Sequence, residues 1–348
     1  MRSGELSSLS AQDLRELYRF LYLTRELEER FERLFKQGKI VGGLYRSLGQ
    51  EATAVGSAYA LEPGDWLSPS IRDMGALLVR GLGPRDMLLQ YMARASSLCR
   101  GKDNTTHFTV PKLGLLGPVS PLGTQLCVLN GVALGFKIRG ERRVCLTYQG
   151  DGASRTGASH EGMNFAAALD LPLVVILQHN RWAFATRSER ESVAEKWTDV
   201  GKAYGLPTVG VDGNDVLQVY DATRDAVYRA RRGGGATLIV AETYRMRGHA
   251  QHDPQHYVPA GELEAWRGRD PIARFERYLI EHGFESGASL RGVREGVDGE
   301  LDLAVEEALA DSMPEPESTR TEVYGAPTQD PSVPWTRRTA VYSDLVGA

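Results

Sequence analysis

The sequence predicts an α/β protein in which helices flank a parallel β-sheet. Four short apolar runs lie in the middle of the 348-residue chain, at residues 143–148, 173–177, 208–211 and 236–241. Helical stretches at residues 158–169 and 215–232 separate the first run from the second and the third from the fourth. Runs this apolar are typical of strands buried on both faces, and alternation of such strands with helices favours a parallel sheet.

Before these strands, the chain is expected to open with a long amphipathic helix. Ser10 and Asp13 have the spacing of a capping box, and apolar side chains recur at helical intervals from Leu14 to Phe35. Gly38 is suited to end the helix. From residue 42 to about residue 140, glycines alternate with short apolar runs, so we expect helices joined by tight loops rather than regular strands.

We expect three regions along the chain. Residues 1–40 form a helical extension, residues 41–260 the α/β domain, and residues 261–348 a helical region followed by an extended tail. Asp270-Pro271 indicates a helix start, and residues 301–309 indicate an acidic helix. After Asp311, proline, glutamate, serine and threonine accumulate, which favours an extended or disordered end.

Composition narrows the class of protein. The 41 Lys and Arg residues against 45 Asp and Glu residues give a net charge of −4, so no positive excess is available to neutralise the phosphates of a nucleic acid. No apolar run approaches the ~20 residues that span a bilayer, and the first residues lack the apolar core of a secretory signal. The three cysteines show no metal-type spacing. We therefore expect a cytoplasmic enzyme that binds neither nucleic acid nor membrane.

Polar residues follow the first two apolar runs. Gly150-Asp151-Gly152 comes after the first, and Gln178-His179-Asn180 after the second. Each segment alone is compatible with an ordinary turn. Because the carboxyl ends of neighbouring parallel strands meet at one edge of a sheet, Asp151 and Asn180 are expected side by side. Carboxylate and amide oxygens together suit a hard cation such as Mg²⁺.

The same segments resemble the thiamine diphosphate signature. Gly150-Asp151-Gly152 is followed, after 26 residues, by His179-Asn180, where the signature usually ends in Asn-Asn. Over residues 15–310 the chain is similar to the alpha subunit of the thiamine-dependent component of 2-oxo acid dehydrogenases. The segments that carry this resemblance are Gly49–Ala52, Ser120–Gln125, Glu161 with Asn164, Val211–Gly213, Tyr244–His249 and Asp270–Ile272. The resemblance implies the thiamine-diphosphate-binding fold.

The resemblance also implies a role for each matching position. Asp151, Asn180 and the backbone carbonyl of Trp182 would hold Mg²⁺. The positions implied to contact thiamine diphosphate are Arg72, Ser120, Leu122, Thr124, Gln125, Gly150, Gly152, Ala153, Gln178 and His249, and His249 is also the implied catalytic residue. Arg72 would grip the diphosphate, whereas Ile71 replaces the usual neighbouring tyrosine and so loses a hydroxyl contact. His107 matches a family histidine whose role is catalytic or structural.

By this resemblance, the protein would catalyse oxidative decarboxylation of a 2-oxo acid and transfer the acyl group to the lipoyl domain of a dihydrolipoyl acyltransferase. A separate beta subunit would supply the carboxylate that activates the aminopyrimidine, in an α2β2 assembly. Residues 120–125 and the absence of a histidine at Met74 favour a branched-chain 2-oxo acid slightly over pyruvate. The alternatives are an acetoin dehydrogenase alpha subunit and a non-catalytic nucleotide-binding α/β protein.

Overall fold

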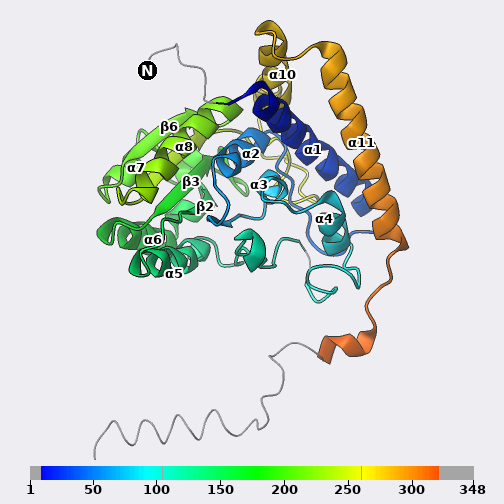
Figure 1. Ribbon diagram of the computed structural model, residues 1–348, viewed down its shortest axis with the longest axis horizontal. Helices are drawn as coiled ribbons and strands as arrows, with labels where there is room; N and C mark the ends of the chain where they lie inside the picture. The colour runs from blue at the N-terminus through cyan, green and yellow to red at the C-terminus, as the bar shows by residue number, and fades with distance from the viewer. Residues whose placement is uncertain (1–8, 104, 260, 321–348) are drawn as a thin grey trace, which may run out of the picture.

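The computed structural model describes residues 9–103, 105–259 and 261–320, and the expected tail beyond Arg320 lies outside these residues. Its centre is a parallel five-stranded sheet with the order β1-β2-β3-β7-β6 (Figure 1). The strands are β1 (Trp66–Ser68), β2 (Cys145–Gly150), β3 (Leu173–His179), β6 (Thr208–Asp212) and β7 (Thr237–Glu242). The four strands predicted from the apolar runs, and their parallel arrangement, are confirmed.

The expectation of no strand between residues 42 and 140 is wrong, because β1 joins the edge of the sheet. Its three residues pair with the start of β2, in the register Trp66↔Cys145. Leu67 is completely buried. A three-residue strand is too short to show a periodic pattern, so only its pairing with β2 reveals it.

Helices cover both faces of the sheet (Figure 1). One face packs against α5 (Thr124–Ile138), α6 (Gly157–Ala168) and α7 (Asp199–Lys202). The other packs against α2 (Glu51–Tyr59), α3 (Met74–Val79), α4 (Pro84–Tyr91) and α8 (Val216–Arg231). Successive strand residues point to opposite faces, so neighbours such as Val175 and Ile176 enter different clusters.

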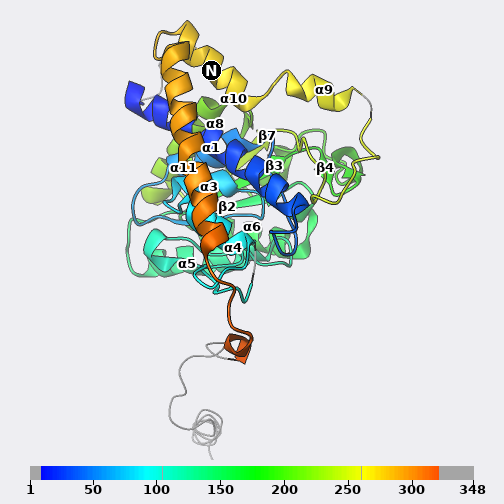
Figure 2. The ribbon, with the colours of Figure 1, turned by 90° about the vertical axis from the view of Figure 1, so that its right-hand side faces the viewer.

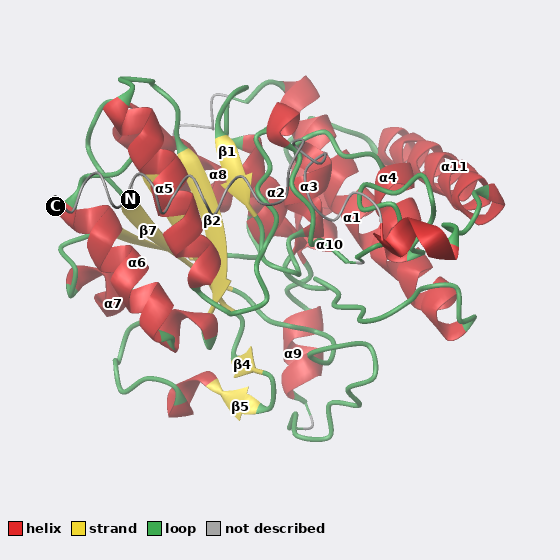
Figure 3. Ribbon diagram, turned by 90° about the horizontal axis from the view of Figure 1, so that it is seen from below, coloured by secondary structure: helices red, strands yellow, loops and turns green. Residues whose placement is uncertain are grey.

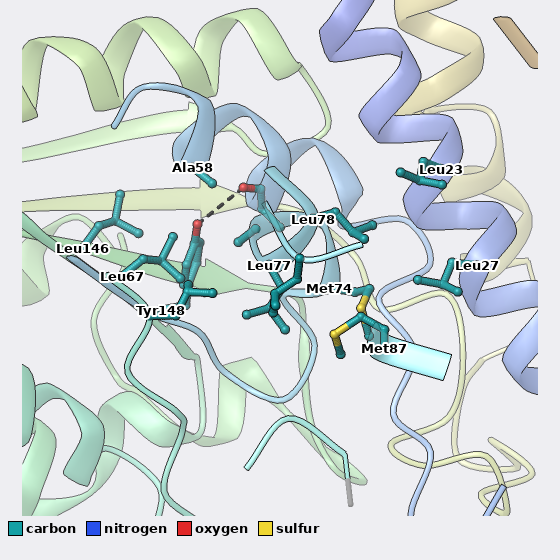
Figure 4. Close-up of a cluster of buried hydrophobic side chains, with 14 of the residues drawn as sticks. Leu23, Leu27, Ala58, Leu67, Met74, Leu77, Leu78, Met87, Leu146 and Tyr148 are labelled. Atoms are coloured by element: carbon teal, nitrogen blue, oxygen red, sulfur yellow. Dashed lines mark hydrogen bonds between the residues drawn. The ribbon is translucent and has the colours of Figure 1, made fainter. Parts of the chain in front are cut away.

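The first helix, α1 (Ala11–Lys36), has the predicted capping box at Ser10. It packs against α10 (Pro271–Glu281) and α11 (Gly287–Ala310), and α11 crosses it at an angle (Figure 2). Figure 4 shows Leu23 and Leu27 of α1 in the same apolar cluster as Tyr148 of β2. The helix is therefore part of the main core, and the predicted acidic helix at residues 301–309 is the last part of α11.

The carboxyl ends of the central strands lie level with one another. Gly150 of β2 pairs with Gln178 of β3, and His179 of β3 pairs with Glu242 of β7. Below this edge, the short hairpin of β4 (Trp182–Ala183) and β5 (Thr186–Arg187) lies beside α9 (Glu262–Arg267), as Figure 3 shows. Arg187 and Glu262 form an ion pair of 3.1 Å between the hairpin and α9. No helix within the described ranges combines the length and apolar character needed to cross a membrane.

A buried carboxyl group in α1 makes stability depend on pH. Glu28 is 1% exposed, and its carboxyl group accepts hydrogen bonds from the Ser47 amide at 2.7 Å and the Ser47 hydroxyl at 2.8 Å. Burial and the negative charge of Glu51 raise the pKa of Glu28 from 4.5 to about 8. Between these values the folded state binds more protons than the unfolded chain, so the contribution of this group falls as pH rises.

We therefore expect Glu28→Gln to stabilise the protein more at about pH 8 than at about pH 5, because the amide keeps the shape of the carboxyl group without its ionisation. Thermal unfolding followed by circular dichroism at both pH values measures the difference. Glu281→Gln, which changes an exposed residue at the end of α10, is the control. Equal shifts of the midpoint at the two pH values would contradict the assignment.

Candidate active site

A cavity of about 720 Å³ opens at the carboxyl edge of the sheet. Its wall contains twelve of the predicted site residues: Arg72, Ser120, Leu122, Gln125, Gly150, Asp151, Gly152, Ala153, Gln178, Asn180, Trp182 and His249. Thr124 is not part of this wall and lies at the first residue of α5. The sheet topology thus brings together segments that are more than 170 residues apart in sequence, Arg72 and His249 among them.

Asp151 lies directly after β2 and is 2% exposed. Its Oδ1 accepts a hydrogen bond from the Gly152 amide at 3.0 Å, while its Oδ2 is buried without a hydrogen-bond partner. Burial raises the pKa of Asp151 above its usual value, and the bond from Gly152 opposes this effect. A buried carboxylate oxygen without a partner is costly, and a cation beside it would remove that cost.

Asn180 and Trp182 offer the other predicted metal-binding oxygens. Asn180 Oδ1 accepts a bond of 3.3 Å from the Trp182 amide, and its Nδ2 donates to Gln50 Oε1 at 3.1 Å, which orients the amide oxygen. Both Asn180 and Trp182 line the cavity together with Asp151. An amide oxygen and a carbonyl oxygen each have a second lone pair free to bind a metal.

The carbonyl of Trp182 is also bound by an arginine that sequence reasoning missed. Arg245 is 1% exposed and donates to the carbonyl of Trp182 at 3.0 Å and to that of Phe184 at 2.8 Å. It also donates to the Tyr257 hydroxyl at 2.6 Å. Its place in the Tyr244–His249 motif was the only signal in the sequence, because the two carbonyl groups that it binds lie some 60 residues earlier.

The donor set fits a magnesium ion that binds through oxygen. One carboxylate, one side-chain amide oxygen and one backbone carbonyl suit Mg²⁺, which usually completes its shell with phosphate oxygens and water. Among the described residues, no group of three or more His, Cys, Asp and Glu side chains could hold a metal. A site built from three or more such side chains is therefore absent from the described residues, whereas the Asp151 set includes a buried oxygen without a partner that a cation would satisfy.

Arg72 and His249 meet on another wall of the cavity. Arg72 Nη2 lies 3.2 Å from His249 Nδ1 and also donates to the carbonyl oxygen of His249. Burial and the positive charges of Arg72 and Arg245 lower the pKa of His249 to about 4. His249 is therefore neutral near pH 7. Arginine can only donate, so Nδ1 accepts from Arg72 and the proton of the ring is on Nε2.

Aromatic rings surround His249, and sequence reasoning had not assigned them to the site. The Tyr45 and Phe184 rings contact His249 edge to face, with centroid distances of 5.6 Å and 4.9 Å. Both residues line the cavity, and Phe184 is 53% exposed. Neither lies in a run or motif that distinguishes a cavity residue from an ordinary core aromatic, so the sequence carried no usable signal.

The segment before α5 forms a third wall. Gln125 Nε2 donates to the Tyr148 carbonyl at 2.6 Å, which ties α5 to β2. Ser120 Oγ lies 3.5 Å from His107 Nε2, and both residues line the cavity. Leu122 is 56% exposed at the same wall, which places an apolar side chain at the opening. The structure thus places His107 at the site, although its role stays open.

Glu191 is a further acidic group near the predicted metal position. Its Oε1 accepts from the Ala183 amide at 3.1 Å, whereas its Oε2 is buried without a hydrogen-bond partner. Burial and the negative charge of Asp151 raise the pKa of Glu191 to about 7. No sequence pattern indicates this residue, because Glu191 lies eight positions after Ala183 and only the fold of the loop brings them together.

The sequence also matches a family of known proteins. Residues 19–317 match the family described as dehydrogenase E1 component. The chain is 32% identical to the alpha subunit of acetoin:2,6-dichlorophenolindophenol oxidoreductase of Cupriavidus necator, over 91% of this chain and 95% of that protein. It is 37% identical to 3-methyl-2-oxobutanoate dehydrogenase subunit alpha of Mycobacterium tuberculosis, over 80% of this chain and 73% of that protein.

A third relative is the pyruvate dehydrogenase E1 component subunit alpha of Rhizobium meliloti, with 32% identity over 92% of this chain and 91% of that protein. The three relatives are alpha subunits, and their names refer to three different substrates. The chain therefore belongs to the dehydrogenase E1 component family of thiamine diphosphate-dependent enzymes, in which it is similar to the alpha subunits of 2-oxo acid and acetoin dehydrogenases.

Proposed function

We propose that the chain is the alpha subunit of a 2-oxo acid dehydrogenase component and binds the diphosphate of thiamine diphosphate through Mg²⁺. The observation that carries this proposal is the orphaned, buried Oδ2 of Asp151, which shares a cavity with Asn180 and Trp182. The Gly150–Ala153 turn borders the same cavity. A cation is needed to join these oxygens to a diphosphate, because the carboxylate and the diphosphate would otherwise repel each other.

The residues of this chain act by binding and orienting. Arg72 carries an Nε that is buried without a hydrogen-bond partner, so its guanidinium has donors available for a diphosphate. His249 is neutral and presents Nε2–H, which suits it to donate a proton or a hydrogen bond near the reacting centre. When bound, thiamine diphosphate would supply a carbanion nucleophile and an electron sink for decarboxylation of the substrate.

We further propose a beta subunit as partner. Thiamine diphosphate needs a carboxylate beside its aminopyrimidine, and Asp151 is the only acidic residue in the cavity wall that the described residues form. In this proposal, Asp151 is occupied by the metal. A second chain must then provide the activating group, and a lipoyl domain of the acyltransferase component would receive the acyl product.

For the substrate, we favour a branched-chain 2-oxo acid. Two exposed apolar side chains lie at the opening, those of Phe184 and Leu122. They suit an aliphatic substituent of the substrate better than a charged one. Acetoin stays as the alternative substrate, because one relative of similar identity is named as an acetoin oxidoreductase subunit. Turnover of 3-methyl-2-oxobutanoate, pyruvate and acetoin by the assembled enzyme distinguishes the three.

The decisive experiment is isothermal titration of thiamine diphosphate with and without Mg²⁺, in the presence of the beta partner. Binding that requires Mg²⁺ supports the proposal. Binding of equal strength with and without the metal would favour a non-catalytic nucleotide-binding protein. No binding under either condition would reject the assignment of the cavity.

A substitution at Arg72 tests the diphosphate contact separately from the metal. We expect Arg72→Lys to weaken thiamine diphosphate binding by roughly tenfold to a hundredfold, because an ammonium group cannot form the two parallel bonds of a guanidinium. Titration of the cofactor at saturating Mg²⁺ measures the loss. Arg267→Lys, at an exposed position of α9, is the matched control. Unchanged affinity in Arg72→Lys would remove Arg72 from the diphosphate site.

A further inference from the structure

His179, the last residue of β3, is buried and has hydrogen-bond partners at both ring nitrogens. It is 3% exposed, and its ring lies against Trp197 with a centroid distance of 4.6 Å. Nδ1 lies 2.8–2.9 Å from the two carboxylate oxygens of Glu242, and Nε2 lies 3.0 Å from Ser188 Oγ. The family signature usually has asparagine here, and a shorter amide could not span both partners in the same way.

The pairing follows from the sheet. His179 of β3 and Glu242 of β7 are register partners at the carboxyl edge, so their side chains point to the same face. The carboxylate only accepts, so Nδ1 donates to Glu242, and Nε2 shares a hydrogen bond with the Ser188 hydroxyl, which can both donate and accept. Arg181 also donates to Glu242, at 2.7 Å, and offsets its negative charge.

Ser188 is the point at which this chain of bonds reaches the loop that carries the proposed metal ligands. Its amide donates to the Arg181 carbonyl at 3.1 Å, which closes the loop around the β4–β5 hairpin. Within the hairpin, Trp182 pairs with Arg187, the residue directly before Ser188. Fixing the Ser188 side chain therefore fixes the strand that sets the direction of the Trp182 carbonyl.

We propose that Glu242, His179 and Ser188 form a positioning relay that holds the β4–β5 hairpin so that the Trp182 carbonyl and Asn180 keep the geometry a divalent cation needs. This inference rests on the proposed magnesium site. The three residues are positioning residues, since none of them lines the cavity. Ser188 is 2% exposed, so the same order of bonds cannot serve as the nucleophilic triad of a hydrolase.

The relay is tested first without cofactor or metal. In the chain assembled with its beta partner, Ser188→Ala removes the hydroxyl contact with His179 and leaves the backbone bonds in place. We expect faster hydrogen exchange at the amides of Ala183 and Ser188, because the loop opens more often. Ser192→Ala is the matched control, since the hydroxyl of Ser192 only accepts from the Ala194 amide at 3.1 Å within its own turn.

The second measurement is the Mg²⁺ concentration that gives half-saturation of thiamine diphosphate binding. We expect Ser188→Ala to raise it roughly tenfold, as is typical when a group that orients a metal ligand is removed. His179→Asn should raise it by a similar factor, and the double variant by less than the product of the two, because both remove the same relay. The maximal rate at saturating Mg²⁺ should change much less.

The outcomes separate this inference from the proposed function. Unchanged exchange in Ser188→Ala overturns the relay, whatever the metal data show. Faster exchange with an unchanged Mg²⁺ requirement also overturns it, because the hairpin would then be held for another purpose. If the wild-type protein shows no Mg²⁺-dependent binding, the proposed function fails as well, and the exchange data alone show whether the hairpin is anchored. Additive effects in the double variant would contradict a shared relay.

Discussion

Asp151→Asn is expected to abolish Mg²⁺-dependent binding of thiamine diphosphate while the fold stays intact. The substitution replaces an anionic ligand by a neutral group of nearly the same shape, and the amide oxygen can still accept from Gly152. We expect the affinity for the metal-bound cofactor to fall by at least about a hundredfold, the upper end of losses seen when groups that support a metal ligand are removed. Isothermal titration gives the loss directly.

Thermal unfolding distinguishes this result from a damaged protein. Because burial raises the pKa of Asp151, its charge is unfavourable in the free protein, and the cofactor-free variant should unfold at the same temperature as the wild type or higher. On addition of cofactor and Mg²⁺, the wild type should gain thermal stability and Asp151→Asn should not. Asp225→Asn, at an exposed site of α8, is the control. Retention of wild-type affinity in Asp151→Asn would mean that the metal site is wrongly assigned.

The chain without its beta partner is expected to show no decarboxylation of 2-oxo acids. In the proposed site it would hold the diphosphate and the metal, but the cavity wall of the described residues has no acidic group apart from Asp151 to activate the aminopyrimidine. We expect activity to appear only when the beta subunit is added, with a stoichiometry of one to one. The assay measures carbon dioxide release with thiamine diphosphate, Mg²⁺ and an artificial electron acceptor.

A mixing experiment adds a control for misfolding. The far-ultraviolet circular dichroism of the mixture should equal the sum of the spectra of the two separate subunits, so that the gain in turnover reflects completion of the site and not folding of the chain. Full turnover by the lone chain would show that the activating carboxylate lies within it. Glu191 would then be the first residue to test. Burial and the negative charge of Asp151 raise its pKa to about 7.

The sequence predicted the central sheet and the meeting of Asp151 with Asn180, because both follow from local patterns. A strand such as β3 is buried on both faces, so its consecutive residues are apolar. Such a short apolar run is therefore typical of a central strand. Once two such strands are adjacent and parallel, their carboxyl ends must meet. The register of Gly150 with Gln178 then places the two side chains at one edge without further information.

Other features depend on contacts between distant segments and leave no local trace. Arg245 belongs to the site because the carbonyls of Trp182 and Phe184 turn toward it, and carbonyl directions are not encoded in residue types. In the sequence, Tyr45 and Phe184 cannot be distinguished from ordinary core aromatics. Only the structure shows that both line the cavity together with His249. The prediction for Thr124 came from resemblance alone, and the structure puts this residue at a helix start outside the cavity wall.

The packing of α1 has a consequence for the synthesis of the protein. Arg30 of α1 forms ion pairs of 3.1 Å and 2.8 Å with Asp298 and Asp302 of α11, about 270 residues later in the chain. At translation rates of roughly 5–20 residues per second, the first helix leaves the ribosome some 14–54 s before its partner helix exists. Throughout that interval, the face that α10 and α11 will cover is exposed to other nascent chains and to chaperones.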